Sequence, residues 1–190
     1  MRYLRPILLI AFLTLSLRAA VWTVPDSLSS IQEAVDTAAS GDTVLVMRSF
    51  QNDGSVHIAG KTIALLANNY IKNPGSYNFS TGVAIYNDNN TLPLLRIENA
   101  DHCLVRGVLF DRNGSENGGG IQIVNSQDVR FDGTYFRGNA LRLSGSGMDL
   151  RNSRLYSYRN AEKSVVLLDA SGLYISESIL RVQSAASLFH

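Results

Sequence analysis

Cysteine is almost absent from this sequence of 190 residues, because Cys103 is the only one. An intramolecular disulfide is therefore excluded, and an exported chain must depend on packing and hydrogen bonds rather than on covalent links. The sequence also lacks a cluster of Cys and His residues with the spacing of a zinc site. No motif implies another cofactor.

The sequence also has no large excess of positive or negative charge, since its formal net charge is only +1. Binding to nucleic acid or to an anionic membrane normally needs a basic surface. The charge balance therefore gives no reason to expect either partner. The length of the chain is enough for one domain with its own core.

A short apolar run lies at the N-terminus. Arg2 and Arg5 precede the run from Ile7 to Leu17, which ends in the small pair Ala19 and Ala20. This order is typical of a secretory signal peptide, whereas a membrane anchor needs about 20 apolar residues. We expect a signal peptide over residues 1–20, no stable anchor after its cleavage, and an exported domain over 21–190, extracellular or in a bacterial envelope. Retention as an uncleaved anchor is the alternative.

A short helix is predicted at the start of that domain. Ser30 and Glu33 have the spacing of a capping box, and Gly41 is placed to end the helix. The apolar stripe of a helix over 31–40 consists of Ile31, Ala34, Val35 and Ala38. The β-branched and aliphatic segment that follows, Asp42 to Met47, predicts a buried strand.

These segments carry a family resemblance. The stretches Trp22 to Pro25, Ser30 to Val35, Ser40 to Val46 and Gly60 to Ile63 resemble the opening of secreted bacterial parallel β-helix proteins of the pectate-lyase-like kind. The turn at Met47 to Phe50 departs from the Pro-Gly-Thr-Tyr type turn of that pattern. The resemblance implies an all-β, right-handed parallel β-helix whose first coil is covered by a helix, and it implies no particular reaction.

Internal repeats support the same fold. Segments that begin at Leu95, Ile121, Leu141 and Val166 are 26, 20 and 25 residues apart, a period typical of stacked solenoid units. An earlier coil contains Val56, Ile58, Ile63 and Leu65. The repeats predict six inward-facing columns: Leu95, Ile121, Leu141, Val166; Ile97, Ile123, Leu143, Leu168; Cys103, Val129, Met148, Leu173; Val105, Phe131, Leu150, Ile175; Val108, Thr134, Ser153, Ser178; and Phe110, Phe136, Leu155, Leu180.

Alternation with period two between turns rich in Gly, Asn and Ser predicts three short sheets in each coil. We expect about five coils between residues 43 and 190, with neighbouring strands about 4.8 Å apart. An antiparallel β-sandwich is the alternative, and the in-phase repeats disfavour it. Asn99 and Asn125 occupy equivalent turn positions, so their amides are expected to stack as a two-rung ladder.

Three charged residues are the candidates for chemistry on an outer face. Arg106, Asp132 and Arg151 fall in one outward column, and Arg130 pairs with Asp149 in the next. The resemblance implies arginine and acidic calcium ligands on an outer sheet face, but a solvated ladder of ion pairs is the favoured interpretation. Cys103 is expected to be a buried structural residue.

One loop carries side chains of the kind that bind calcium, and no other feature of the sequence supports a calcium site. The loop from Asp111 to Gly118 has oxygen-bearing side chains at alternate positions. An EF-hand is excluded, because Glu116 stands where that loop needs glycine and Gln122 where it needs a bidentate glutamate. A turn without metal is the favoured interpretation.

Tyrosines are the candidates for carbohydrate contact, because aromatic rings stack on sugar rings. The long irregular stretch expected from Asn68 to Pro93 contains Tyr77 and Tyr86, and Tyr135 and Tyr156 are expected to extend the same surface.

Two functions follow as hypotheses. The first is a non-catalytic scaffold that binds an extracellular polysaccharide or a partner surface, or the N-terminal part of a larger one. The alternative is a lyase or glycoside hydrolase acting on uronic-acid-rich polysaccharide, for which the sequence identifies no catalytic residues. Leu188 predicts the first strand of a further coil, so we also expect self-association through an open C-terminal coil.

Overall fold

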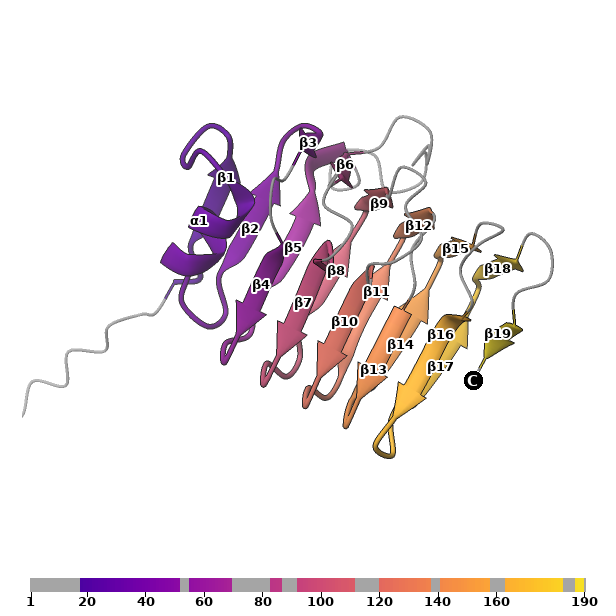
Figure 1. Cartoon of the computed structure of the whole chain (residues 1–190). Helices are drawn as coiled ribbons and strands as arrows, with labels where there is room; N and C mark the ends of the chain where they lie inside the picture. Colours follow the sequence, from indigo (N-terminus) through magenta and orange to yellow (C-terminus); the bar gives the residue numbers. More distant parts are fainter. Residues whose placement is uncertain are drawn as a thin grey trace, which may run out of the picture.

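The chain forms a β-helix with one short helix at its N-terminal end (Figure 1). The computed structural model describes residues 18–51, 55–69, 83–86, 92–111, 120–137, 141–157, 163–182 and 187–189. Three parallel sheets run the length of these residues, and each coil contributes one strand to each sheet. The predicted fold class is therefore confirmed.

The first sheet has seven strands in the described part of the chain, all paired in parallel. They are β1 (Val21–Val24), β2 (Thr43–Val46), β5 (Ala64–Ala67), β8 (Leu104–Arg106), β11 (Val129–Asp132), β14 (Gly147–Arg151) and β17 (Gly172–Ser176). The second sheet consists of β3 (Phe50–Gln51), β6 (Ala84–Tyr86), β9 (Leu109–Asp111), β12 (Tyr135–Arg137), β15 (Arg154–Ser157) and β18 (Ile179–Val182).

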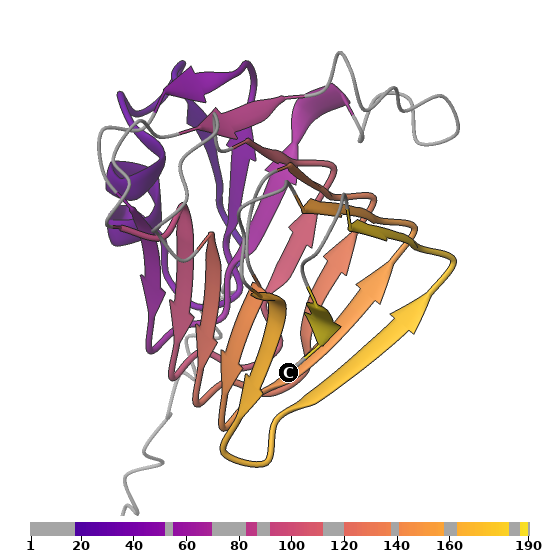
Figure 2. The same ribbon diagram turned by 45° about the vertical axis from the view of Figure 1, so that its right-hand side comes forward.

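The third sheet completes each coil (Figure 2). Its strands are β4 (Val56–Ala59), β7 (Leu95–Glu98), β10 (Ile121–Val124), β13 (Leu141–Ser144), β16 (Lys163–Leu168) and β19 (Ser187–Phe189). Within the described residues the three-strand cycle is completed six times, one more than the five expected. The additional coil includes β19, which contains Leu188 as predicted.

The strand register confirms the inward columns with one exception. Leu141 is paired with Val165 and Leu143 with Leu167, so the predicted assignment of Val166 and Leu168 to these columns is wrong by one residue. The segment has four consecutive apolar residues, 165–168. Alternation alone therefore does not fix which of them face inward.

The irregular stretch expected from Asn68 to Pro93 is also interrupted. Residues Ala84–Tyr86 form β6, which pairs with β3 and β9. Three residues are too few for a visible period-two pattern.

Residues in the left-handed region turn the chain from one sheet to the next. Gly107, Gly133, Asn152 and Glu177 have positive φ values of 71°, 59°, 47° and 48° at equivalent positions after strands of the first sheet. Asn99, Asn125 and Gly145 do the same after strands of the third sheet. Glycine and asparagine adopt this conformation most readily, which explains their recurrence in the repeats.

Hydroxyl groups, rather than amides, form the internal ladders. The backbone N–H of Ala100 donates to Ser126 Oγ at 3.0 Å, and that of Ser126 donates to Ser146 Oγ at 3.2 Å. Thr134 and Ser153, both buried, are bonded at 2.9 Å between their hydroxyls.

The predicted asparagine ladder is replaced by these hydroxyl contacts. Asn99 and Asn125 are exposed residues with positive φ. Their main role is conformational, at the corner between two sheets.

The helix α1 (Ile31–Thr37) covers the first coil, as Figure 1 shows. Ser30 caps it by accepting from the Glu33 N–H at 3.1 Å, as predicted. The second half of the capping box differs, because Glu33 Oε2 accepts from the N–H of Ser29 at 2.9 Å. The helix also ends earlier than residue 40, since Ala38 is extended and buried, and Gly41 belongs to the turn before β2.

Two side chains attach this helix to the β-helix. Gln32 pairs its amide with the backbone of His57 on β4, the edge strand of the third sheet, at 2.7 and 3.2 Å. Lys61 Nζ donates to the carbonyl oxygens of Val35, Asp36 and Ala38 at 2.6–3.1 Å. The helix therefore occupies hydrogen-bonding groups at an otherwise open edge. No helix among the described residues is long and apolar enough to span a membrane.

Candidate functional site

The outward faces of the three sheets carry different side chains, and each face has polar residues that could form a site. The first sheet carries the charged candidates. Arg106 and Asp132 lie on neighbouring strands and form an ion pair of 3.0 Å between Nε and Oδ2. Asn152 Nδ2 donates to the second oxygen of Asp132 at 3.1 Å. The predicted column therefore exists, and Asp132 is held by two donors.

Arg151, the third predicted member, pairs mainly with another carboxylate. It is aligned with Asp132 in the register, but its guanidinium contacts Asp149 on its own strand, with Nε 2.6 Å from Oδ2. This hydrogen bond and the charge of Asp149 raise the pKa of Arg151. Arg130 approaches the same carboxylate at 3.8 Å. This face thus carries a series of ion pairs between and along neighbouring strands.

The second sheet brings three of the four candidate tyrosines onto one set of strands. Tyr86 is aligned with Asp111, Asp111 with Arg137, and Arg137 with Tyr156, on four consecutive strands from β6 to β15. We call these four residues the tyrosine column. Tyr135 lies two residues before Arg137, in the neighbouring outward column. Tyr77 lies outside the described residues.

An ion pair occupies the middle of the tyrosine column. Arg137 donates from Nε to Asp111 Oδ1 at 2.7 Å, and its Nη2 contacts the other carboxylate oxygen. The Asp111 side chain is 13 % exposed and that of Arg137 is 40 % exposed. Both oxygens of Asp111 are therefore used by Arg137, and residues 112–118 of the loop considered for calcium lie outside the described residues. The residues that the structure describes contain no group of three potential metal ligands.

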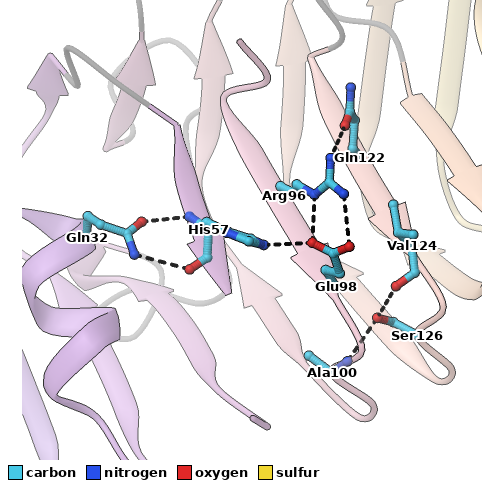
Figure 3. A network of polar contacts seen from close by, with 8 residues as sticks. All are labelled: Gln32, His57, Arg96, Glu98, Ala100, Gln122, Val124 and Ser126. Carbon is cyan, nitrogen blue, oxygen red and sulfur yellow. Dashed lines mark hydrogen bonds and ion pairs between the residues drawn. The ribbon is translucent and has the colours of Figure 1, made fainter. Parts of the chain in front are cut away.

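The third sheet holds a polar network that the sequence did not reveal (Figure 3). Glu98 accepts from Arg96 Nε and Nη2, both at 3.0 Å, and its Oε2 lies 3.1 Å from His57 Nε2. Arg96 also donates to Gln122 Oε1 at 3.3 Å. The hydrogen bond from Arg96, together with charge, lowers the pKa of Glu98 despite partial burial. Gln32 extends the network to the helix.

The signal for this network lay in the outward positions of the repeats. His57, Arg96 and Gln122 each stand between two inward residues of their strands and are aligned in the register. The period-two alternation that locates the core also places these three side chains on one outward face.

Cys103 lies inside the β-helix, as its predicted inward column requires. It is completely buried, and its thiol lies 3.6 Å from the carbonyl oxygen of Lys61. Burial raises the pKa of the Cys103 thiol, which disfavours the nucleophilic thiolate.

Comparison with protein-family models, with curated proteins and with solved structures gives no match. The geometry itself establishes the parallel β-helix, and the chemistry of the outward faces is the basis for assigning a function.

Proposed function

We propose that the chain is an exported scaffold that binds polysaccharide through the tyrosine column of the second sheet. The observation that carries the proposal is the alignment of Tyr86, Asp111, Arg137 and Tyr156 on four consecutive strands. The resemblance of the N-terminal segments to pectate-lyase-like proteins and the signal-like leader support export and an extracellular polymer as the ligand.

The spacing of the column suits a linear polymer. Neighbouring strands of a sheet are about 4.8 Å apart, which is close to the length of one pyranose unit along an extended chain. A polysaccharide lying parallel to the axis of the β-helix would therefore meet one side chain of the column at about every sugar. Repetition along a rigid sheet adds contacts without ordering a loop.

The chemistry of the column also suits sugars. Tyrosine offers an apolar ring for the C–H face of a sugar and a hydroxyl for its polar edge. Arg137 is half-exposed and its orientation is fixed by Asp111, so its guanidinium is preorganised to donate to hydroxyl or carboxylate oxygens.

A catalytic alternative is supported by one observation on the third sheet. His57 is 3.1 Å from the Glu98 carboxylate, the arrangement in which a carboxylate orients an imidazole as a general base. A neighbouring arginine, Arg96, is within the same network. This is the observation that favours a lyase or hydrolase acting on uronic-acid-rich polysaccharide.

Affinity gel electrophoresis and an absorbance assay separate the two functions. The protein is run in gels containing pectate, alginate, xylan or a β-glucan, and each polymer is also incubated with it and followed for unsaturated products and reducing ends. The scaffold predicts retardation by at least one polymer and no product. Tyr86→Ala and Arg137→Gln should weaken binding at least tenfold, while Arg142→Gln, an exposed residue of the third sheet, should not.

The opposite pattern contradicts the proposal. Product formation that is lost in His57→Ala favours the enzyme. Retardation that Tyr86→Ala and Arg137→Gln leave unchanged removes the tyrosine column as the binding face.

A further inference from the structure

A hollow of about 500 Å³ lies on the first sheet, on a different face from the tyrosine column and from the network of His57 and Glu98. Its polar lining comes from His102, Asp128, Arg130 and Asp149, and Leu104 contributes an outward apolar side chain. Cys103, whose side chain is buried, also borders the hollow. His102 and Asp128 occupy the corners that lead into β8 and β11, and the others belong to these strands and β14 or lie directly before them. The volume is within the usual range for small-molecule sites.

Two ion pairs line this hollow. Arg130 Nε lies 3.8 Å from Asp149 Oδ2, and His102 Nδ1 lies 3.3 Å from Asp128 Oδ2. The Arg130 side chain is 50 % exposed, whereas Asp149 is 22 % exposed and is also bonded by Arg151. Asp149 thus has a fixed position, and Arg130 can turn toward a ligand.

An exposed tyrosine lies on the strand next to that of Asp149. Tyr174 is aligned with Asp149 in the register of β14 and β17, and Leu104 with Arg130 on the other side. Tyr174 is 74 % exposed, more than any other large hydrophobic residue in the part of the chain that the structure describes. The outward column therefore runs from an apolar side chain through a cation and an anion to an exposed aromatic ring.

This mixture of groups restricts the class of ligand. The lining carries two carboxylates and one guanidinium, and the neighbouring Arg151 guanidinium is already bonded to Asp149, so a simple anion gains little net attraction. The polar lining disfavours a purely apolar ligand. Sugar hydroxyls both donate and accept, so they can satisfy Asp128, Arg130 and Asp149 together.

We propose that this hollow binds a single neutral sugar ring, as a second saccharide site on a face different from the tyrosine column. Hydroxyls of the ring donate to the carboxylates of Asp128 and Asp149 and accept from Arg130, and its C–H face packs against Tyr174. A molecule with both sites would hold two saccharide segments on different faces, so it would cross-link a polysaccharide network. Sugar binding in this hollow does not depend on the proposed function of the second sheet.

Saturation-transfer difference NMR of the 190-residue chain tests the site with the methyl pyranosides of glucose, galactose and mannose, and with sodium sulfate in competition. We expect transfer to at least one glycoside, reduced at least fivefold by Arg130→Gln and by Asp128→Asn. Asparagine suits the positive φ of 54° at residue 128, so this variant keeps the corner. Arg142→Gln, at an exposed residue of the third sheet, should leave the signal unchanged.

Three results would overturn the proposal. One is the absence of transfer to all three glycosides while circular dichroism shows a folded protein. Another is transfer that both hollow variants leave intact. The third is displacement of the glycoside by millimolar sulfate, which would identify an anion site. Where both hollow variants keep the transfer, its loss in Tyr86→Ala would place the sugar on the second sheet and support the other site.

Discussion

Phe131 lies at the centre of an aromatic cluster inside the β-helix. Its ring is completely buried, with centroids 5.4 Å from Phe136 and 6.4 Å from Phe110. Phe131→Ala should lower the free energy of unfolding by about 3–5 kcal/mol, through lost burial and the cavity that remains. Arg106→Ala, which removes a partly exposed ion pair, should cost less than about 1 kcal/mol. Equal denaturant midpoints for the two variants would contradict the inward assignment.

Ser126 has a structural role that its small size conceals. Its Oγ accepts from the buried N–H of Ala100 at 3.0 Å, and the hydroxyl donates to the carbonyl of Val124 at 2.9 Å (Figure 3). Ser126→Ala leaves the Ala100 N–H without this partner, which should cost about 1–3 kcal/mol.

Ser144→Ala is the matched control for that variant. The Ser144 hydroxyl donates to the exposed Asp169 at 2.6 Å, so its loss should cost less than about 0.5 kcal/mol. Urea denaturation measures both variants. A Ser126→Ala midpoint equal to that of Ser144→Ala would show that the ladder contributes no stability.

At the scale of the elements, the start of the chain is tied together by one carboxylate. Asp42 accepts from the N–H groups of Ala20 at 2.7 Å and Ala39 at 2.9 Å, and from Trp22 Nε1 at 3.1 Å. These hydrogen bonds, that of Ala20 first, lower the pKa of Asp42. Because the folded-state pKa lies below the unfolded value, the contribution to stability is complete above the ordinary aspartate pKa and is lost as the pH falls below about 4.

Acid should therefore loosen the N-terminal end of the molecule. Trp22 is the only tryptophan, so its fluorescence reports on the contact with Asp42 directly. We expect its acid transition below about pH 4, and a weaker dependence of stability on pH in Asp42→Asn. Asp26→Asn, at an exposed residue, is the control. The same pH dependence in Asp42→Asn and in the unchanged protein would contradict this role.

The elements themselves were predictable where a local rule dictates them. The Ser30 cap, the strand after Asp42 and the inward columns follow from capping chemistry and from period-two alternation. The register of Val165 was not predictable, because its neighbours are also apolar. The network of His57, Glu98 and Arg96 joins residues as far as 41 apart, and only the stacking of coils brings them together.

At the scale of the whole molecule, the two ends of the β-helix differ. The helix covers the first coil, whereas Ile175, aligned inward with the buried Leu150, is 38 % exposed in the last described coils. Exposed core positions favour association. We propose that the 190-residue chain self-associates through this end, and that Ile175→Lys weakens association at least tenfold. Analytical ultracentrifugation measures this, and a monomer at all concentrations before the substitution would contradict it.

The three outward faces explain why the sequence predicted the fold better than the function. The columns of the core repeat from coil to coil, so several copies of one pattern support each inward position. The outward side chains differ from coil to coil, as in the sequence from Tyr86 through Asp111 to Arg137. A site on such a face occurs once, so no repeat in the sequence reveals it. The tyrosines were predicted from their residue type, whereas their neighbours in the column, Asp111 and Arg137, were not.

NMR chemical-shift mapping tests whether the tyrosine column of the second sheet binds the polysaccharide. Backbone amides of the protein are followed during titration with oligosaccharides of the polymer that retards it most in the gel. We expect the largest shifts on β6, β9, β12 and β15, around Tyr86, Asp111, Arg137 and Tyr156. Largest shifts on β4, β7 and β10, around His57 and Glu98, would contradict it and would place the polysaccharide on the third sheet.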